Sequence, residues 1–142
     1  MPEHGGEQLL GFDFGLSQIG VASGHSGSGL VSPLQILNCR DGGPPWPAIE
    51  NLIAQWQPAR LLVGLPLNMD GSDSESTRLA RRFGNRLHGR TGIAVSWVDE
   101  RLSSREAREI NQHSHQRRRH DRIDDLAAAL IVQRYLDQLA AR

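Results

Sequence analysis

The hydrophobic positions in the first third of the chain follow the two-residue period of β-strands. Residues 8–14 (QLLGFDF) alternate and stop at Gly15, and residues 19–23 (IGVAS) resume the pattern after a tight turn. A Gly- and Ser-rich loop at 24–29 precedes a third extended segment at 31–37. Three strands joined by such short turns predict an antiparallel meander.

The period then changes to that of a helix. After the Gly-Gly-Pro-Pro break at 42–45, apolar residues recur at helical spacing between Trp46 and Trp56, and Pro58 ends the helix. Both tryptophans are therefore expected in the core. Residues 60–64 (RLLVG) are almost wholly apolar, as in a strand buried on both faces.

A second helix and a fifth strand follow. Ser72 and Glu75 form an S-x-x-E capping box, which predicts a helix start, and an apolar stripe at Leu79, Phe83 and Leu87 is expected to face inward. Residues 93–98 (IAVSWV) read as a strand that ends at Asp99-Glu100.

The C-terminal third is predicted to be helical. Ser103 and Glu106 form another capping box, residues 112–122 contain no apolar side chain, and residues 123–139 are rich in Ala and Leu. The order β-β-β-α-β-α-β-α-α predicts an α/β domain with a mixed five-stranded sheet, antiparallel in its first three strands. We expect one domain over residues 1–142, with 1–7 and 112–122 flexible.

Charge is unevenly distributed although the formal net charge is zero. Residues 1–77 carry two Arg and eight acids, or −6, whereas residues 78–122 carry twelve Arg and five acids, or +7. A basic flank beside an acidic site suits a polyanionic ligand. The single Cys39, the polar N-terminus and the absence of any apolar run near about 18 residues predict a cytoplasmic protein that does not cross a membrane.

Three acids distant in sequence are the candidate chemistry. Asp13 lies inside an apolar strand, where an acid is costly without a partner. Glu100 follows the last strand, at the end where α/β sheets place their sites, and Asp124 lies in the first turn of the final helix. Two like charges about 4 Å apart repel by roughly 4 kcal/mol at an effective dielectric of about 20, so such a cluster shares protons or binds cations. Oxygen ligands favour Mg²⁺ or Mn²⁺.

Each acid also has a structural alternative. Asp13 could be bonded within the turn that ends at Gly15. Glu100 could pair with Arg101 or Arg105 at the surface, which would leave Asp99 as its substitute. Asp124 could be an acid favoured by the helix macrodipole, and either Asp121 or Asp125 could replace or assist it.

Four motifs in this order resemble the YqgF/RuvX family. They are residues 11–15 (GFDFG) with 19–22 (IGVA), residues 63–71 (VGLPLNMDG), residues 99–104 (DERLSS), and Ile123-Asp124 followed by Ala127-Ala128. They span nearly the whole chain. The second and third together are highly specific.

The resemblance implies an RNase H-like fold, shared with Holliday-junction resolvases, and nuclease processing of the 5′ end of precursor 16S rRNA. The acids that it implies are Asp13, Glu100 and Asp124, the set already selected by position. One departure is that members often carry a basic residue before the Ile-Gly-Val-Ala run, where this chain has Leu16-Ser17-Gln18. A phosphate contact from that turn is therefore not expected.

Several polar residues are candidates for substrate binding. Asn68, Asp70 and Gly71 follow a buried strand at the expected site edge, although they could simply form the turn before the next helix. Arg101 could hold a phosphate in a bidentate fork, or pair with Glu106 or Asp99. Arg117, Arg118 and Arg119 could order on a polyanion or remain solvated. Residues His113, His115 and His120 have no acid or Cys at the spacing that a metal site needs.

The leading hypothesis is two-metal hydrolysis of a phosphodiester bond, with Asp13 bridging two Mg²⁺ or Mn²⁺ ions and Glu100 and Asp124 completing the ligand set. We expect a nucleic-acid partner, RNA in preference to DNA, within a pre-ribosomal particle. We expect a monomer or weak homodimer. The alternatives are a resolvase acting on four-way DNA as a stable two-fold dimer, and a non-catalytic RNA-binding assembly factor.

Overall fold

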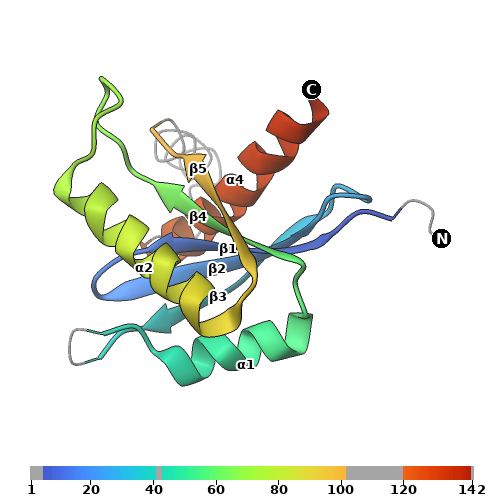
Figure 1. Ribbon diagram of the computed structural model, residues 1–142, viewed down its shortest axis with the longest axis horizontal. Helices are drawn as coiled ribbons and strands as arrows, with labels where there is room; N and C mark the ends of the chain where they lie inside the picture. Colours follow the sequence, from blue (N-terminus) through green and yellow to red (C-terminus); the bar gives the residue numbers. More distant parts are fainter. Residues whose placement is uncertain (1–4, 41–42, 102–119, 142) are drawn as a thin grey trace.

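A mixed sheet forms the centre of the molecule (Figure 1). The computed structural model describes residues 5–40, 43–101 and 120–141, with 120–125 described by their backbone alone. Within these ranges the sheet has five strands in the order β3-β2-β1-β4-β5. The strands are β1 (Gln8–Phe14), β2 (Gln18–His25), β3 (Val31–Asn38), β4 (Arg60–Leu65) and β5 (Ala94–Asp99).

Strand direction agrees with the predicted mixed sheet. β1 pairs antiparallel with β2, and β2 pairs antiparallel with β3. β1 pairs parallel with β4, with Phe12 opposite Val63, and β4 pairs parallel with β5, with Gly64 opposite Val98. The carboxyl ends of β1, β4 and β5 therefore meet at one edge, where sheets of this kind bind ligands.

Helices α1 (Trp46–Trp56) and α2 (Glu75–Thr91) cover one face of the sheet (Figure 1). Phe83 of α2 lies at the centre of this layer, with ring centroids 5.8 Å from Phe12, 5.0 Å from Phe14 and 5.7 Å from Trp46. Trp46 is buried and Trp56 packs partly buried against the same core, as predicted. Such aromatic pairs add stability beyond the area they bury.

Helix α4 (His120–Ala140) covers the opposite face of the sheet (Figure 1). It approaches the sheet closely because two strands present glycines beneath it. A Cβ added to Gly11 would lie 2.5 Å from Cγ2 of Val132, and one added to Gly24 would lie 2.3 Å from Cγ1 of Val132. Both distances are impossible for real atoms, so the seat of α4 depends on glycine at these positions.

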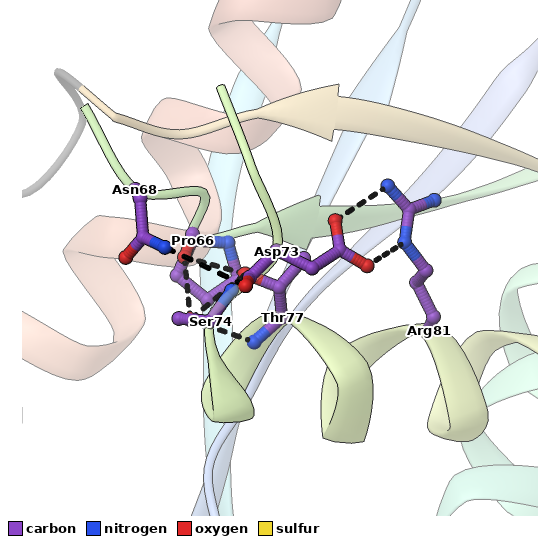
Figure 2. Close-up of polar contacts among 6 residues, drawn as sticks. All are labelled: Pro66, Asn68, Asp73, Ser74, Thr77 and Arg81. Atoms are coloured by element: carbon purple, nitrogen blue, oxygen red, sulfur yellow. Dashed lines mark hydrogen bonds and ion pairs between the residues drawn. The ribbon is translucent and has the colours of Figure 1, made fainter. Parts of the chain in front are cut away.

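The start of α2 differs from the prediction. The N-cap is Ser74, not Ser72, and its partner in the capping box is Thr77, not Glu75. Figure 2 shows the reason: the hydroxyls of Ser74 and Thr77 both lie against the carbonyl oxygen of Pro66, at 3.1 and 2.7 Å. The loop before the helix thus selects the cap, whereas Ser72 bonds with Asp70 inside that loop.

Parts of the two segments that were expected to be flexible have defined structure. α4 begins at His120, so residues 120–122, expected to be flexible, lie in its first turn. Glu7 exchanges hydrogen bonds with Ser26 at 2.7 and 3.0 Å, although it was expected in a flexible segment. The second capping box, Arg105, residues 112–119 with Arg117, Arg118 and Arg119, and His113 and His115 lie outside the described residues. Across the described helices, none is long and apolar enough to span a membrane.

Candidate active site

Asp13 occupies the α4 face of the sheet at the end of β1. Along β1, Leu9 belongs to the core beneath α4 and Gly11 lies under Val132, so the two-residue period brings Asp13 to the same face. Leu10 and Phe12 fill the opposite core. Asp13 is partly buried, and it faces Gly20 across the β1–β2 pair.

Glu100 follows β5 directly, and its side chain lies over β4. The backbone N–H of Glu100 donates to the carbonyl oxygen of Leu65 at 3.1 Å, which extends the β4–β5 ladder by one bond. A Cβ added to Gly64 would lie 2.9 Å from both the carboxyl carbon and Oε2 of Glu100. Because Gly64 has no side chain, the Glu100 carboxyl group occupies the space that a side chain at this position would fill.

The two acids interact electrostatically. Burial, together with the smaller effects of the nearby charges of Asp13 and Asp99, raises the pKa of Glu100 to about 8. β4, which carries Gly64, lies between β1, the strand of Asp13, and β5, which Glu100 follows, and the Glu100 carboxyl group lies above this glycine. A bound cation would relieve this repulsion and favour the ionised form of Glu100.

The backbone of α4 places position 124 near the end of β1 that carries Asp13. The carbonyl oxygen of Ala128 lies 3.5 Å from a Cβ added to Gly11, and Val132, one turn later, lies over Gly11 and Gly24. Position 124 is one turn before Ala128 in the same helical row, toward the end of β1 that carries Asp13. The side chains of Asp121, Asp124 and Asp125 lie outside the described residues, so the choice among them stays a prediction.

The donor set fits a hard divalent cation. Within the residues described, no group of three His, Cys, Asp or Glu side chains is placed to hold a metal ion. The coupled pair Asp13 and Glu100 supplies carboxylate oxygens that repel each other when ionised, which is the arrangement that Mg²⁺ and Mn²⁺ stabilise. A third acid from the start of α4 would complete such a set.

Arg101 pairs with Asp99, not with Glu100. Its Nε and Nη2 donate to the Asp99 carboxylate at 3.0 and 2.6 Å, and this bonding holds the pKa of Asp99 below its usual range. The surface alternative for Glu100 through Arg101 is therefore wrong, and Asp99 is engaged elsewhere. Arg101 also donates through Nη1 to the carbonyl oxygen of Met69 at 3.0 Å.

The loop at 66–73 is a hydrogen-bonded turn. Asn68 donates to the Ser72 hydroxyl at 3.0 Å, and Asp70 accepts from the backbone N–H and hydroxyl of Ser72 at 2.9 and 2.6 Å. Gly71 has a φ of +89°, which favours glycine. Arg101 ties this turn to the end of β5, so the two most specific motifs of the sequence adjoin in space.

The sequence did not predict two features of the candidate site. Gly64 was taken only as the end of an apolar strand, although a glycine inside such a strand signals a close approach. A hollow of about 280 Å³ also adjoins the end of β5, and its lining includes Arg134 and Gln138 of α4. Arg134 follows the apolar run 126–132 of α4, and the sequence holds no further signal for this hollow.

The model of one protein family matches most of the chain. This is RuvX, described as Holliday junction resolvase, and the match covers residues 7–138. The chain belongs to the RuvX family. The predicted recognition and enzyme class are thereby confirmed: this RuvX-family chain is a nuclease, a hydrolase of phosphodiester bonds.

Curated relatives of this RuvX-family chain carry the name "Putative pre-16S rRNA nuclease". The protein from Nitrosococcus oceani is 53% identical over 131 residues, which cover 92% of this chain and 86% of that one. The protein from Escherichia coli O157:H7 is 45% identical over 132 residues, which cover 92% of this chain and 96% of that one.

Solved structures of resolvases share the fold. RuvC of T. thermophilus in complex with a Holliday junction substrate has a TM-score of 0.58 and 14% sequence identity, covering 92% of this chain and 96% of RuvC. The fowlpox virus Holliday junction resolvase has a TM-score of 0.52 and 11% identity, covering 94% and 98%. At these identities the likeness concerns architecture, and the predicted RNase H-like fold is confirmed.

Proposed function

We propose that this chain, as a single nuclease domain acting in the cytoplasm, processes the 5′ end of precursor 16S rRNA with the help of divalent metal. The observation that carries the proposal is the placement of the Glu100 carboxyl over Gly64, in electrostatic contact with Asp13. The names of the curated relatives support the rRNA substrate, and the acidic edge supports metal-assisted hydrolysis.

Asp13, Glu100 and Asp124 would hold the Mg²⁺ or Mn²⁺ ions through their carboxylate oxygens. When bound, the metal supplies an activated water and stabilises the leaving 3′ oxygen. Asp13 is held by the β1–β2 ladder, where it pairs with Gly20, and the backbone bond to Leu65 holds Glu100. Because both acids are anchored by sheet hydrogen bonds, little rearrangement is required of them.

The substrate would lie across the carboxyl edge of the sheet. Arg101 is proposed to exchange part of its pairing with Asp99 for a phosphate, since a guanidinium binds either anion in the same bidentate geometry. Asn68, Asp70 and Gly71 would contact the sugar-phosphate backbone through the turn that Arg101 holds. Arg117, Arg118 and Arg119 would supply further phosphate contacts.

The deciding experiment compares two substrates and three proteins. A 5′-extended 16S rRNA fragment and a four-way DNA junction are incubated with Mg²⁺ or Mn²⁺ and with wild type, Asp13→Asn or Asp137→Asn. Asp137 is an exposed α4 acid that accepts a hydrogen bond from Gln133, so its variant is the matched control. We expect metal-dependent cleavage of the RNA that Asp13→Asn abolishes and Asp137→Asn retains. Full activity of Asp13→Asn would overturn the proposal.

A resolvase is the second candidate because the fold of RuvC covers 92% of this chain. Cutting two strands symmetrically requires a two-fold dimer, so sedimentation of a stable dimer together with junction cleavage would favour it. A pre-ribosomal particle as partner would be tested by co-sedimentation with small-subunit precursors.

A further inference from the structure

A hollow of about 150 Å³ lies on the α2 side of the sheet edge. We name it the α2 hollow; its walls include Phe14, Leu16, Pro44, Leu79, Arg82 and Arg86. Leu16 is 65% exposed, so a large apolar side chain faces solvent at its rim. Apolar walls with two guanidinium groups suit a ligand that combines a flat apolar body with negative charge.

The unpaired positive charges of α2 lie at this hollow. The helix carries five Arg and one Glu. Three of the arginines are neutralised: Arg78 pairs with Glu75, Arg81 with Asp73 at 3.0 Å, and Arg90 with Glu50 at 3.0 Å. Arg82 and Arg86 have no carboxylate partner among the described residues. The two α2 arginines that form no ion pair among the described residues are therefore the two that line the hollow.

Arg86 is also held in place by an aromatic ring. Its guanidinium carbon lies 5.3 Å from the ring centroid of Trp46, which is itself buried against Phe83. A cation fixed over a ring in this way keeps its outer N–H groups free to bind an anion in a defined direction.

The α2 hollow adjoins the candidate active site. Phe14 follows Asp13 on β1, and Leu16 is three residues from Asp13, a span of at most roughly 11 Å along the backbone. Asp13 faces α4 while Phe14 packs on α2, so the site and the hollow lie on opposite faces of one sheet edge. A strand of nucleic acid crossing that edge would reach both.

We propose that the α2 hollow binds one unstacked nucleotide of single-stranded RNA beside the scissile bond, with the base against Leu16 and Phe14 and the flanking phosphates on Arg82 and Arg86. Single-stranded binders combine a positive groove with apolar or aromatic platforms for bases, and a paired base cannot enter such a hollow. The turn at 16–18 has no basic residue, so α2 supplies the charge at this point. The inference rests on the proposed nuclease function and specifies which substrate segment it holds.

The test measures binding rather than cleavage. A fluorescein-labelled oligouridylate of twelve nucleotides is titrated by anisotropy at several salt concentrations, with every protein carrying Asp13→Asn to prevent cleavage. Each phosphate contact on a single strand contributes about 0.7 to the slope of log K against log salt, so Arg82→Ala/Arg86→Ala should lower it by about 1.4. Arg82→Ala alone should lower the slope by about 0.7 and avoids any loss of packing on Trp46.

Two controls separate the hollow from general charge. Arg78→Ala removes the same charge from the same helix but is paired with Glu75, and it should leave the slope within experimental error. Leu16→Ala should weaken the single-strand complex at least about threefold with no change in slope, and leave binding of a duplex RNA unchanged. Thermal unfolding confirms that each variant is folded.

The outcomes distinguish this inference from the proposed function. Equal slopes for wild type and the double variant would overturn phosphate binding at the hollow, even if the enzyme cleaves RNA. An equal loss of slope in Arg82→Ala and Arg78→Ala would do the same. Equal weakening of single-stranded and duplex RNA by Leu16→Ala would overturn the base contact. Slope changes as expected, with no metal-dependent cleavage of RNA by the native chain, would support nucleotide binding in the hollow and overturn the proposed metal-assisted rRNA processing.

Discussion

The carboxyl group of Glu100 lies in the volume that a side chain at position 64 would fill. Cδ and Oε2 of Glu100 are both 2.9 Å from a Cβ placed on Gly64, and Cδ1 of Ile131 is 2.5 Å from the same point. One glycine on β4 thus allows two different neighbours to come close: an acid from the end of β5 and an apolar side chain from α4.

Replacing this glycine should affect both neighbours. We expect Gly64→Ala to displace the Glu100 carboxyl and to strain Ile131, with a loss of about 1–3 kcal/mol in the free energy of unfolding and weaker Mn²⁺ binding. Urea denaturation and calorimetric titration measure the two effects. The matched control is Gly89→Ala on α2, where nothing lies within 4 Å and alanine should stabilise by about 0.5–1 kcal/mol. Unchanged metal affinity in Gly64→Ala would contradict the contact.

The stability of the metal-free protein should depend on Glu100. Its pKa of about 8 in the folded chain exceeds its ordinary value of 4.5, so the folded state binds the proton more tightly than the unfolded state. The stabilisation is complete below pH 4.5 and is lost as pH rises through 8, with a slope of at most about 1.4 kcal/mol per pH unit. Glu100→Gln should flatten the profile, as should saturating Mn²⁺. Identical profiles for wild type and Glu100→Gln would refute this.

Arg101 provides a test of phosphate binding. Arg101→Lys keeps the charge but loses the planar fork that holds Asp99, so we expect KM for the RNA substrate to rise about tenfold with kcat little changed. Arg78→Lys, an exposed pair on α2, is the control and should leave KM unaltered. A fall in kcat with constant KM would assign Arg101 to the chemical step instead.

The cap of α2 can be assigned by two serine variants. Ser74→Ala should lower the free energy of unfolding by about 1 kcal/mol because the N–H of Thr77 loses its acceptor at 3.1 Å. Ser72→Ala removes only exposed bonds within the turn and should cost a few tenths of a kcal/mol, the range expected of a surface substitution. An equal loss of unfolding free energy in the two variants would contradict the assignment of Ser74 as the N-cap.

That cap shows where sequence reasoning reaches its limit. The pattern S-x-x-E at 72–75 met the local rule, but the carbonyl of Pro66 decides in favour of Ser74, and its position depends on how the loop leaves β4. Strand bounds, in contrast, agreed within about two residues because hydrophobic period reports burial directly.

The same distinction applies to the site. Asp13 was found because an acid inside an apolar strand is costly without a partner, and Glu100 because it directly follows the last strand, at the end where α/β sheets place their sites. The role of Gly64 depends on the strand order β1-β4-β5, which places it between those acids and which no local pattern records. The hollow lined by Arg134 likewise needs α4 to be docked before it exists.

The glycines beneath α4 also determine how the helix is tilted against the sheet. Val132 rests on Gly11 and Gly24, and position 124 lies eight residues away, roughly 12 Å along the axis. A single methyl group added at Gly11 would tilt the helix about this pivot and move its acidic end relative to Asp13. Gly11→Ala should therefore lower activity although every carboxylate remains, and Val132→Ala in the same chain should restore it. The size of the side chain at position 132 therefore limits the size of the side chains that positions 11 and 24 can carry.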